Sequence, residues 1–167
     1  MKKIFTLLFL FIGFNSFAQF TQGNLVVYRV GDGSAALTSA ATAVFLDEYS
    51  PSGTLVQSIP MPTAVAGANK RITASGSATS EGLITRSVDR KYLVFAGYDA
   101  AVGTAAVNGT TSATVNRVVG RIDATEALDA TTAFTDFPTG GNMRGVASTN
   151  GTDFWATGSV GGVRYAA

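Results

Sequence analysis

Apolar and polar residues along this chain of 167 residues follow a short-period pattern that is typical of β-strands. β-Branched and aromatic residues gather in runs such as 25–30 and 92–98, and glycine, serine, threonine or proline ends each run. Such runs between turn residues predict strands. Apolar spacing at i, i+3, i+4 and i+7, which would predict amphipathic helices, is missing. The pattern therefore predicts an all-β fold.

Short breaks rich in turn residues separate successive runs and predict antiparallel hairpins. The first break, Ser50–Gly53, contains proline and glycine, and the last contains Asn150 and Gly151, the strongest short-range hairpin signal. The expected hairpins join 44–49 to 54–59, 83–87 to 92–98, 117–122 to 127–132, and 144–148 to 152–158. One more strand is expected at 163–165.

Two stretches of the chain repeat. Residues 87–97 align without a gap on 148–158, and residues 49–55 align on 122–128. Two kinds of hairpin therefore alternate, and together they form a unit of four antiparallel strands, A to D. The complete unit has strand A at 83–87, B at 92–98, C at 117–122 and D at 127–132.

A four-stranded antiparallel unit that repeats at a spacing of tens of residues is typical of β-propeller blades. In the residues 48–57, 87–95 and 144–155, the chain resembles secreted bacterial β-propellers. These motifs specify an architecture and say nothing about a ligand. The resemblance implies an all-β fold of antiparallel four-stranded blades.

The resemblance also implies an incomplete ring. Blade 1 is expected to supply strands B to D at about 25–59, blade 2 to be complete at about 83–132, and blade 3 to supply strands A to C at about 144–165. Because a closed propeller needs at least four blades, the chain is expected to be the first part of a longer protein. Similar propellers take the missing A strand of the first blade from their C-terminus.

The N-terminus reads as a secretory signal. Lys2 and Lys3 precede the apolar run Ile4–Phe14, and Ser16 and Ala18 are small residues at the positions that a signal peptidase inspects. The run is shorter than the roughly 20 apolar residues of a membrane span. We expect a signal peptide at 1–18 with cleavage after Ala18, a partial propeller at 19–167, location outside the cell or at its surface, and no membrane span after cleavage.

Composition excludes several classes of function. Without Lys2 and Lys3, the 12 basic residues fall to 10, against 11 acidic residues. A nearly neutral chain without a block of like charge lacks the basic surface that nucleic-acid binding requires. The absence of cysteine and histidine removes disulfides, thiol nucleophiles, Ser-His catalysis and the usual zinc sites. We assign no catalytic residue, metal site or cofactor.

Two motifs that suggest chemistry lack the required context. Gly31, Gly33 and Ala36 fit the dinucleotide fingerprint, but only residues 37–42 stand before the next expected strand, too few for the helix that this site requires. The segment is better interpreted as a loop between strands B and C. The acidic residues do not follow the spacing of a calcium-binding loop.

The connections differ in length, and this difference marks a candidate binding face. The connections 31–42, 60–82, 99–116 and 133–143 are long and emerge on one face of a propeller, whereas the others are tight turns. The low-complexity loop 101–114 is equally compatible with binding and with mobility. Polar residues at this face could bind a sugar or a carboxylate, or serve only as paired or solvated surface charges. They are Lys70, Arg71, Glu81, Asp99, Arg117, Asn142 and Arg144.

The sequence therefore predicts an exported, non-catalytic β-propeller segment. It would act as a binding or structural module, with a protein or a glycan at the cell surface as partner. The alternative is a fragment of a propeller enzyme, lactonase-like or polysaccharide-degrading, whose catalytic residues lie in missing blades. The lack of histidine and of a clear acidic cluster weighs against the enzyme.

Overall fold

The computed structural model describes residues 19–167, so the signal peptide expected at 1–18 lies outside the described residues. Regular structure in this part of the chain consists of strands and one short 3₁₀ helix. In chain order the elements are β1 (Leu25–Val30), β2 (Ala41–Tyr49), β3 (Leu55–Pro60), β4 (Thr73–Ser75), β5 (Thr85–Arg86), β6 (Tyr92–Tyr98), η1 (Val107–Gly109), β7 (Arg117–Asp123), β8 (Leu128–Asp129), β9 (Ala133–Phe134), β10 (Met143–Ser148), β11 (Phe154–Gly158) and β12 (Val163–Ala166).

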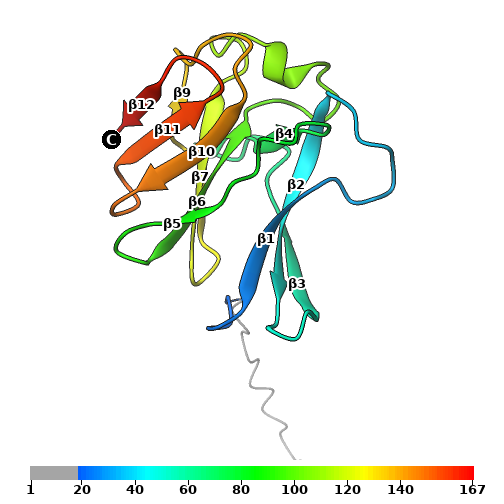
Figure 1. Ribbon diagram of the computed structural model, residues 1–167, viewed down its shortest axis with the longest axis vertical. Helices are drawn as coiled ribbons and strands as arrows, with labels where there is room; N and C mark the ends of the chain where they lie inside the picture. Colours follow the sequence, from blue (N-terminus) through cyan, green and yellow to red (C-terminus); the bar gives the residue numbers. More distant parts are fainter. Residues whose placement is uncertain (1–18) are drawn as a thin grey trace, which may run out of the picture.

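The strands form three successive antiparallel groups (Figure 1). The first sheet is β1–β2–β3, the second sheet is β5–β6–β7 with β8 and β9, and the third sheet is β10–β11–β12. Strand β4 pairs with both β2 and β6, which joins the first and second sheets into a nine-stranded network. The expected all-β, antiparallel fold is confirmed, as are the four hairpins β2–β3, β5–β6, β7–β8 and β10–β11.

Strand β4 lies inside the segment 60–82, which the sequence analysis treated as a loop. Its three residues are too short a run to show an alternating pattern, and all three are buried. The Thr73 hydroxyl donates hydrogen bonds to the carbonyls of Tyr98 and Ala100, at 3.1 and 3.2 Å. Tertiary contacts rather than local sequence preference therefore fix this strand.

The expected strand at 127–132 is shortened to β8, and β9 follows just beyond its predicted end. The carboxylate of Asp129 accepts hydrogen bonds from the backbone and hydroxyl of Thr131, which forms a local turn. The Ala130 N–H donates to the Asn69 side chain, and the Lys70 N–H donates to the Ala130 carbonyl. Ala130 thus pairs with the segment before β4 instead of with β7.

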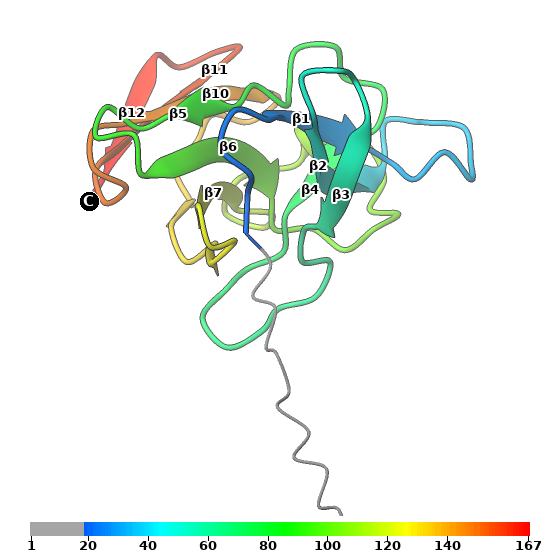
Figure 2. The same cartoon turned by 90° about the horizontal axis from the view of Figure 1, so that it is seen from below.

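Figure 2 shows how the three sheets are arranged. The second sheet shares one hydrophobic core with the first sheet and another with the third. On β6, Phe95 faces the core shared with the first sheet, whereas Val94 and Ala96 face the core shared with the third. On β7, Val118 and Val119 divide in the same way. Because both faces of the second sheet are buried, its strands read as continuous apolar runs rather than as an alternation.

The connection after Gly33 contains no helix. Residues 31–40 form bends and irregular backbone, and β2 begins at Ala41, three residues before the expected start at Val44. The side chain of Asp32 accepts hydrogen bonds from the backbone and hydroxyl of Ser34, so this carboxylate caps its own turn. The segment is a loop between two antiparallel strands, which agrees with the interpretation favoured from the sequence.

Candidate functional site

The long connections meet at one end of the molecule, and Figure 1 shows those after β1, β6 and β9 together there. The first contacts the second, since the Val107 N–H donates to the Ser39 carbonyl. The second contacts the third through the Ser112 hydroxyl, which donates to the carbonyls of Thr135 and Phe137. Val107 is fully buried. The low-complexity loop 101–114 is therefore anchored at several points.

Arg117 stabilises the loops at this end of the molecule, although arginine is usually an exposed residue. Its side chain is fully buried, and the guanidinium donates to the carbonyls of Thr110 and Val115 at 2.7 and 2.6 Å. The guanidinium carbon lies 4.8 Å from the centroid of the Tyr98 ring. Arg117 therefore holds the β6–β7 connection in place and does not face solvent.

Three other predicted binding residues are engaged internally. The Arg71 side chain donates to the Asp99 carboxylate at 2.7 Å. Glu81 accepts hydrogen bonds from the Tyr98 hydroxyl and from the Ser75 N–H. These groups tie β4 and its flanks to the end of β6.

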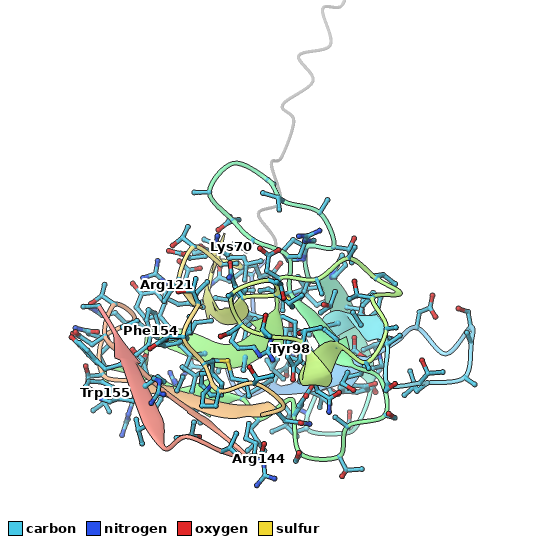
Figure 3. All side chains as sticks on the ribbon, turned by 90° about the horizontal axis from the view of Figure 1, so that it is seen from above. Lys70, Tyr98, Arg121, Arg144, Phe154 and Trp155 are labelled. Atoms are coloured by element: carbon cyan, nitrogen blue, oxygen red, sulfur yellow. The ribbon has the colours of Figure 1, made fainter. Side chains whose placement is uncertain are left out.

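The remaining predicted residues do not converge. The Asn142 side-chain carbonyl accepts a hydrogen bond from Asn108 at 3.2 Å, which joins two long connections. Within residues 19–167, the side chains of Lys70 and Arg144 have no hydrogen-bond or ion-pair partner. Figure 3 places these two residues on opposite sides of the molecule. The seven predicted residues therefore form internal ties and scattered charges rather than one site.

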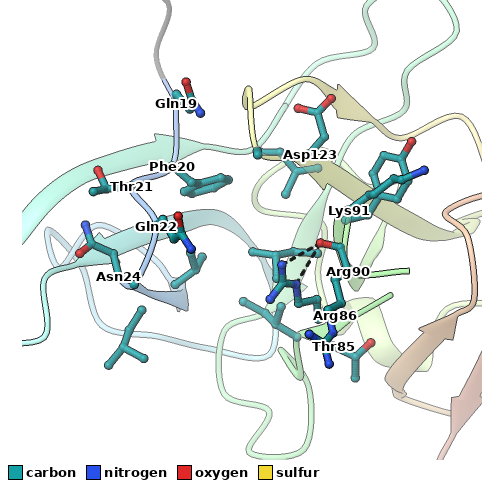
Figure 4. Close-up of a pocket in the computed structure, with 18 residues that line it drawn as sticks. Gln19, Phe20, Thr21, Gln22, Asn24, Thr85, Arg86, Arg90, Lys91 and Asp123 are labelled. Carbon is teal, nitrogen blue, oxygen red and sulfur yellow. Dashed lines mark hydrogen bonds between the residues drawn. The ribbon is translucent and has the colours of Figure 1, made fainter. Parts of the chain in front are cut away.

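A groove of about 710 Å³ lies at the other end of the molecule, where the turns are tight (Figure 4). It lies between the N-terminal segment and the β5–β6 turn, and the end of β7 also lines it. Its lining consists of residues 19–26, 84–86, 90–93 and 122–124. This combination of segments makes the groove the candidate functional site.

One wall of the groove is the N-terminal segment, which Glu48 holds against the sheet. Glu48 is fully buried, and one carboxylate oxygen accepts hydrogen bonds from the Thr21 N–H and the Asn24 side chain, both at 2.7 Å. The other oxygen accepts a hydrogen bond from the Gln57 side chain at 2.6 Å. The Phe20 N–H adds a bond to the Ala124 carbonyl. The wall is therefore fixed by several bonds to the first and second sheets.

The opposite wall carries three cationic side chains from the β5–β6 turn. The guanidinium of Arg86 donates two hydrogen bonds to the Arg90 carbonyl, at 3.1 and 2.8 Å, and Figure 4 shows both residues across the groove from Gln22 and Asn24. Lys91 lies 3.8 Å from the Asp89 carboxylate and remains largely exposed. The charges thus project from an ordered turn.

Contacts with the third sheet hold this turn in place. The N–H groups of Val88 and Asp89 donate to the carbonyls of Ser148 and Thr149, both at 3.0 Å. The Asp89 carboxylate accepts a hydrogen bond from the Ser87 hydroxyl at 2.6 Å, and this bond lowers the pKa of Asp89. The cationic wall is therefore preorganised by the fold.

The single carboxylate in the lining, that of Asp123, turns toward its own loop. It accepts hydrogen bonds from the backbone and hydroxyl of Thr125 and from the Ala127 N–H. Burial opposes ionisation of Asp123, but these bonds outweigh it and lower the pKa. All three bonds reach Oδ1 and leave Oδ2 without a partner among residues 19–167. The ionised Asp123 therefore sets one negative charge against the three positive charges of the lining, which leaves an excess of positive charge.

Sequence reasoning missed this groove because its walls come from distant parts of the chain. Arg86, Arg90 and Lys91 do form a local cluster of charge, but they lie in or beside a tight turn, whereas the sequence analysis sought binding residues at the long connections. The N-terminal wall is held in place by hydrogen bonds to the buried Glu48. The register of β2 places Glu48 on the strand face that is directed toward the second sheet. The dense charge of residues 86–91 is the one signal that pointed to this region.

The acidic residues do not form a metal site in the described part of the chain. No group of three or more aspartate, glutamate, histidine or cysteine side chains with a suitable arrangement occurs among residues 19–167. Asp47, for example, pairs with Arg29 and accepts a hydrogen bond from Ser58. Among these residues there is also no helix with the length and apolar character needed to cross a membrane.

No protein-family model, curated protein or solved structure matches this chain.

The buried Glu48 and the partly buried Glu81 give opposite expectations for the dependence of stability on pH. Burial opposes ionisation of Glu48, but hydrogen bonds from Gln57, Thr21 and Asn24 outweigh it and lower the pKa below the ordinary 4.5. Burial raises the pKa of Glu81, and the hydrogen bond from Tyr98 offsets this only in part. Glu48 therefore stabilises the fold above pH 4.5 and loses this effect as the pH falls through its folded-state pKa. Glu81 destabilises the fold as the pH rises from 4.5 through its folded-state pKa.

Urea unfolding of Glu48→Gln and Glu81→Gln between about pH 3 and pH 7 measures this difference. The deficit of Glu48→Gln relative to wild type is expected to grow with pH and to reach about 2 kcal/mol at neutral pH, because charge-assisted hydrogen bonds are lost. The unfolding free energy of Glu81→Gln is expected to rise relative to wild type over the same range. Parallel curves for the two variants would contradict both assignments.

Proposed function

We propose that this chain is an exported, non-catalytic binding module, part of a β-propeller, and that its groove binds an anionic partner. The observation that carries the proposal is the groove itself, which has three cationic side chains on an ordered wall against a single carboxylate, that of Asp123. Binding suits these residues better than catalysis does. The lining contains one carboxylate, that of Asp123, and no second carboxylate or histidine with which it could form an acid–base pair.

The stacking of the sheets supports the propeller part of the proposal. In the alignment of residues 87–97 on 148–158, Val94 corresponds to Trp155 and Ala96 to Thr157. Val94 and Ala96 pack against the third sheet, whereas Trp155 is 37% exposed beside Tyr165 on the outward face of that sheet. The corresponding positions of the second sheet pack against a neighbouring sheet. The exposed aromatic face of the third sheet is therefore the face against which a further blade would pack.

The binding part is tested with the double variant Arg90→Ser, Lys91→Ser. Within residues 19–167 neither side chain makes a hydrogen bond, and the variant removes only the exposed ion pair of Lys91 with Asp89, so the fold is expected to be unchanged. Affinity for a fluorescent decaglutamate peptide is expected to fall about tenfold at low salt. The matched control is Lys70→Ser, Arg144→Ser, which removes the same charge away from the groove. Fluorescence anisotropy gives both dissociation constants. Equal affinities for the two variants would rule out the groove as the site.

A further inference from the structure

We infer that a second cavity, on the second sheet, binds a neutral sugar unit of an oligosaccharide through neighbouring hydroxyl groups. The cavity has a volume of about 390 Å³, and its lining shares Tyr92 and Asp123 with the groove. Its polar lining also includes Asn69, Arg121 and Asp129. This size lies within the range of small-molecule sites. The sugar would bind by hydrogen bonds, whereas the groove attracts its partner by charge, so each site can be tested without the other.

The second cavity belongs to a sheet whose two neighbours are both present. Its lining comes from β6, β7, β8 and their flanks, with Asn69 from the connection before β4. The second sheet shares one core with the first sheet and another with the third. In the proposed propeller, further blades would pack against the first and third sheets. The cavity would therefore stay open in a larger ring.

Asp123 and Asn69 are each fixed by one side-chain atom and leave the other free. The Oδ1 atom of Asp123 accepts three hydrogen bonds from its own turn, and Oδ2 has no partner among residues 19–167. The Oδ1 atom of Asn69 accepts a hydrogen bond from the Ala130 N–H at 2.8 Å. In the same part of the chain, the Asn69 Nδ2 group donates to no acceptor. The cavity thus holds a free acceptor and a free donor on anchored side chains.

The Tyr92 hydroxyl also has no partner within the described residues, whereas its ring is tightly packed. A Cβ atom on Gly151 would lie 2.4 Å from a ring carbon, and the Arg121 guanidinium carbon lies 4.9 Å from the ring centroid. Arg121 is itself held, since it donates to the Gly151 carbonyl at 2.6 Å and to the Asp129 carboxylate at 2.7 Å. The hydroxyl is therefore presented by a ring whose position is fixed.

A neutral sugar matches these free groups better than an ion does. Each hydroxyl of a pyranose ring both donates and accepts hydrogen bonds, so adjacent hydroxyls need acceptors and donors together. Asp123 supplies an acceptor, Asn69 supplies donors, and the Tyr92 hydroxyl can act as either. An anion would meet the two carboxylates of the cavity, and a cation would meet the Arg121 guanidinium.

The two carboxylates favour binding of the sugar over its hydrolysis. Glycosidic bond cleavage generally requires a carboxylic acid whose pKa is raised, so that it can protonate the leaving group. Burial opposes ionisation of Asp123 and Asp129, but hydrogen bonds from their own turns outweigh it and lower the pKa of both. Both groups are therefore ionised at neutral pH, and neither can act as the acid.

Two substitutions remove free groups and keep the groups that fix the fold. Asp123→Asn keeps an oxygen for the turn and replaces the free acceptor by an amide donor, and Tyr92→Phe removes only the hydroxyl. Isothermal titration calorimetry measures binding of cellohexaose, mannohexaose and xylohexaose. At least one should bind the wild-type protein with a dissociation constant of about 1 mM or below. Asp123→Asn is expected to weaken this binding about tenfold or more, and Tyr92→Phe about fivefold.

Matched controls carry the same substitutions outside the cavity. Asp32, like Asp123, accepts hydrogen bonds from its own turn through Oδ1. The Tyr49 hydroxyl, like that of Tyr92, has no hydrogen-bond partner among residues 19–167. Asp32→Asn and Tyr49→Phe are therefore expected to leave sugar binding unchanged. Thermal unfolding monitored by circular dichroism checks that all four variants fold.

The same titrations separate this site from the groove. The variant Arg90→Ser, Lys91→Ser should bind the sugar as the wild type does, and Asp123→Asn should not weaken decaglutamate binding, because it removes a negative charge. If the sugar binds as expected and decaglutamate does not bind, the groove proposal falls and the second site stands. Loss of sugar binding in Arg90→Ser, Lys91→Ser would place the sugar in the groove and overturn the second site.

Three further results would overturn the second site. The first is that none of the three oligosaccharides binds at about 5 mM, well above the expected dissociation constant. The second is that folded Asp123→Asn and Tyr92→Phe bind the sugar as tightly as the wild type does. The third is release of reducing ends from the bound oligosaccharide, which would show hydrolysis in place of binding.

Discussion

Replacing Arg117 by methionine is expected to lower the free energy of unfolding by about 3–5 kcal/mol. Methionine keeps most of the aliphatic packing but leaves the carbonyls of Thr110 and Val115 without their donor, and each unsatisfied buried carbonyl costs about 1–3 kcal/mol. The β6–β7 connection should also lose its order. Urea unfolding measures the first effect, and hydrogen exchange of residues 106–116 measures the second.

Arg121→Met is the control for this experiment. Arg121 is partly exposed and donates hydrogen bonds to the Gly151 carbonyl and to Asp129, so its loss should cost about 1 kcal/mol. The exchange of residues 106–116 should not change in this variant. An Arg117→Met protein as stable as Arg121→Met would contradict the role given to Arg117.

The second large effect is expected for Gly151→Ala, at about 2–4 kcal/mol. Gly151 has φ +81°, and a Cβ atom there would lie 2.4 Å from a ring carbon of Tyr92. Alanine would therefore suffer both the strain of a left-handed backbone, about 1 kcal/mol, and overpacking of about 1–3 kcal/mol. The loss is measured by urea unfolding.

Gly140→Ala separates these two contributions. Gly140 has φ +73°, but nothing lies within 4 Å of the Cβ position. This variant should show only the backbone cost of about 1 kcal/mol. If Gly151→Ala is no worse than Gly140→Ala, the contact between the β10–β11 turn and Tyr92 does not contribute to stability.

Much of the strand pairing was predictable because it depends on local sequence. The turn at Asn150 and Gly151 fixes the pairing of β10 with β11, and the break at Ser50–Gly53 does the same for β2 and β3. Strand β4 was not predictable, since its three residues carry no periodic signal and their partners lie on β2 and β6. The division of β8 from β9 likewise depends on Asn69, which is distant in sequence.

The candidate site was less predictable than the fold. An arginine beside a long loop reads as an exposed charge, and only the tertiary structure buries Arg117 beneath the loop that it supports. The groove depends on the meeting of the N-terminal segment with the β5–β6 turn, which are separated along the chain by strands β1 to β4. Its cationic residues are visible in the sequence, but the wall opposite them is not.

The division of β6 between two cores has a consequence for how the molecule loses its structure. Phe95 and Val94 are joined by one peptide bond, yet each belongs to a different core. Each outer sheet packs its apolar face against this shared middle sheet. Displacement of the middle sheet would therefore expose both cores to water. The three sheets should therefore melt as one cooperative body, although they are assembled from local hairpins.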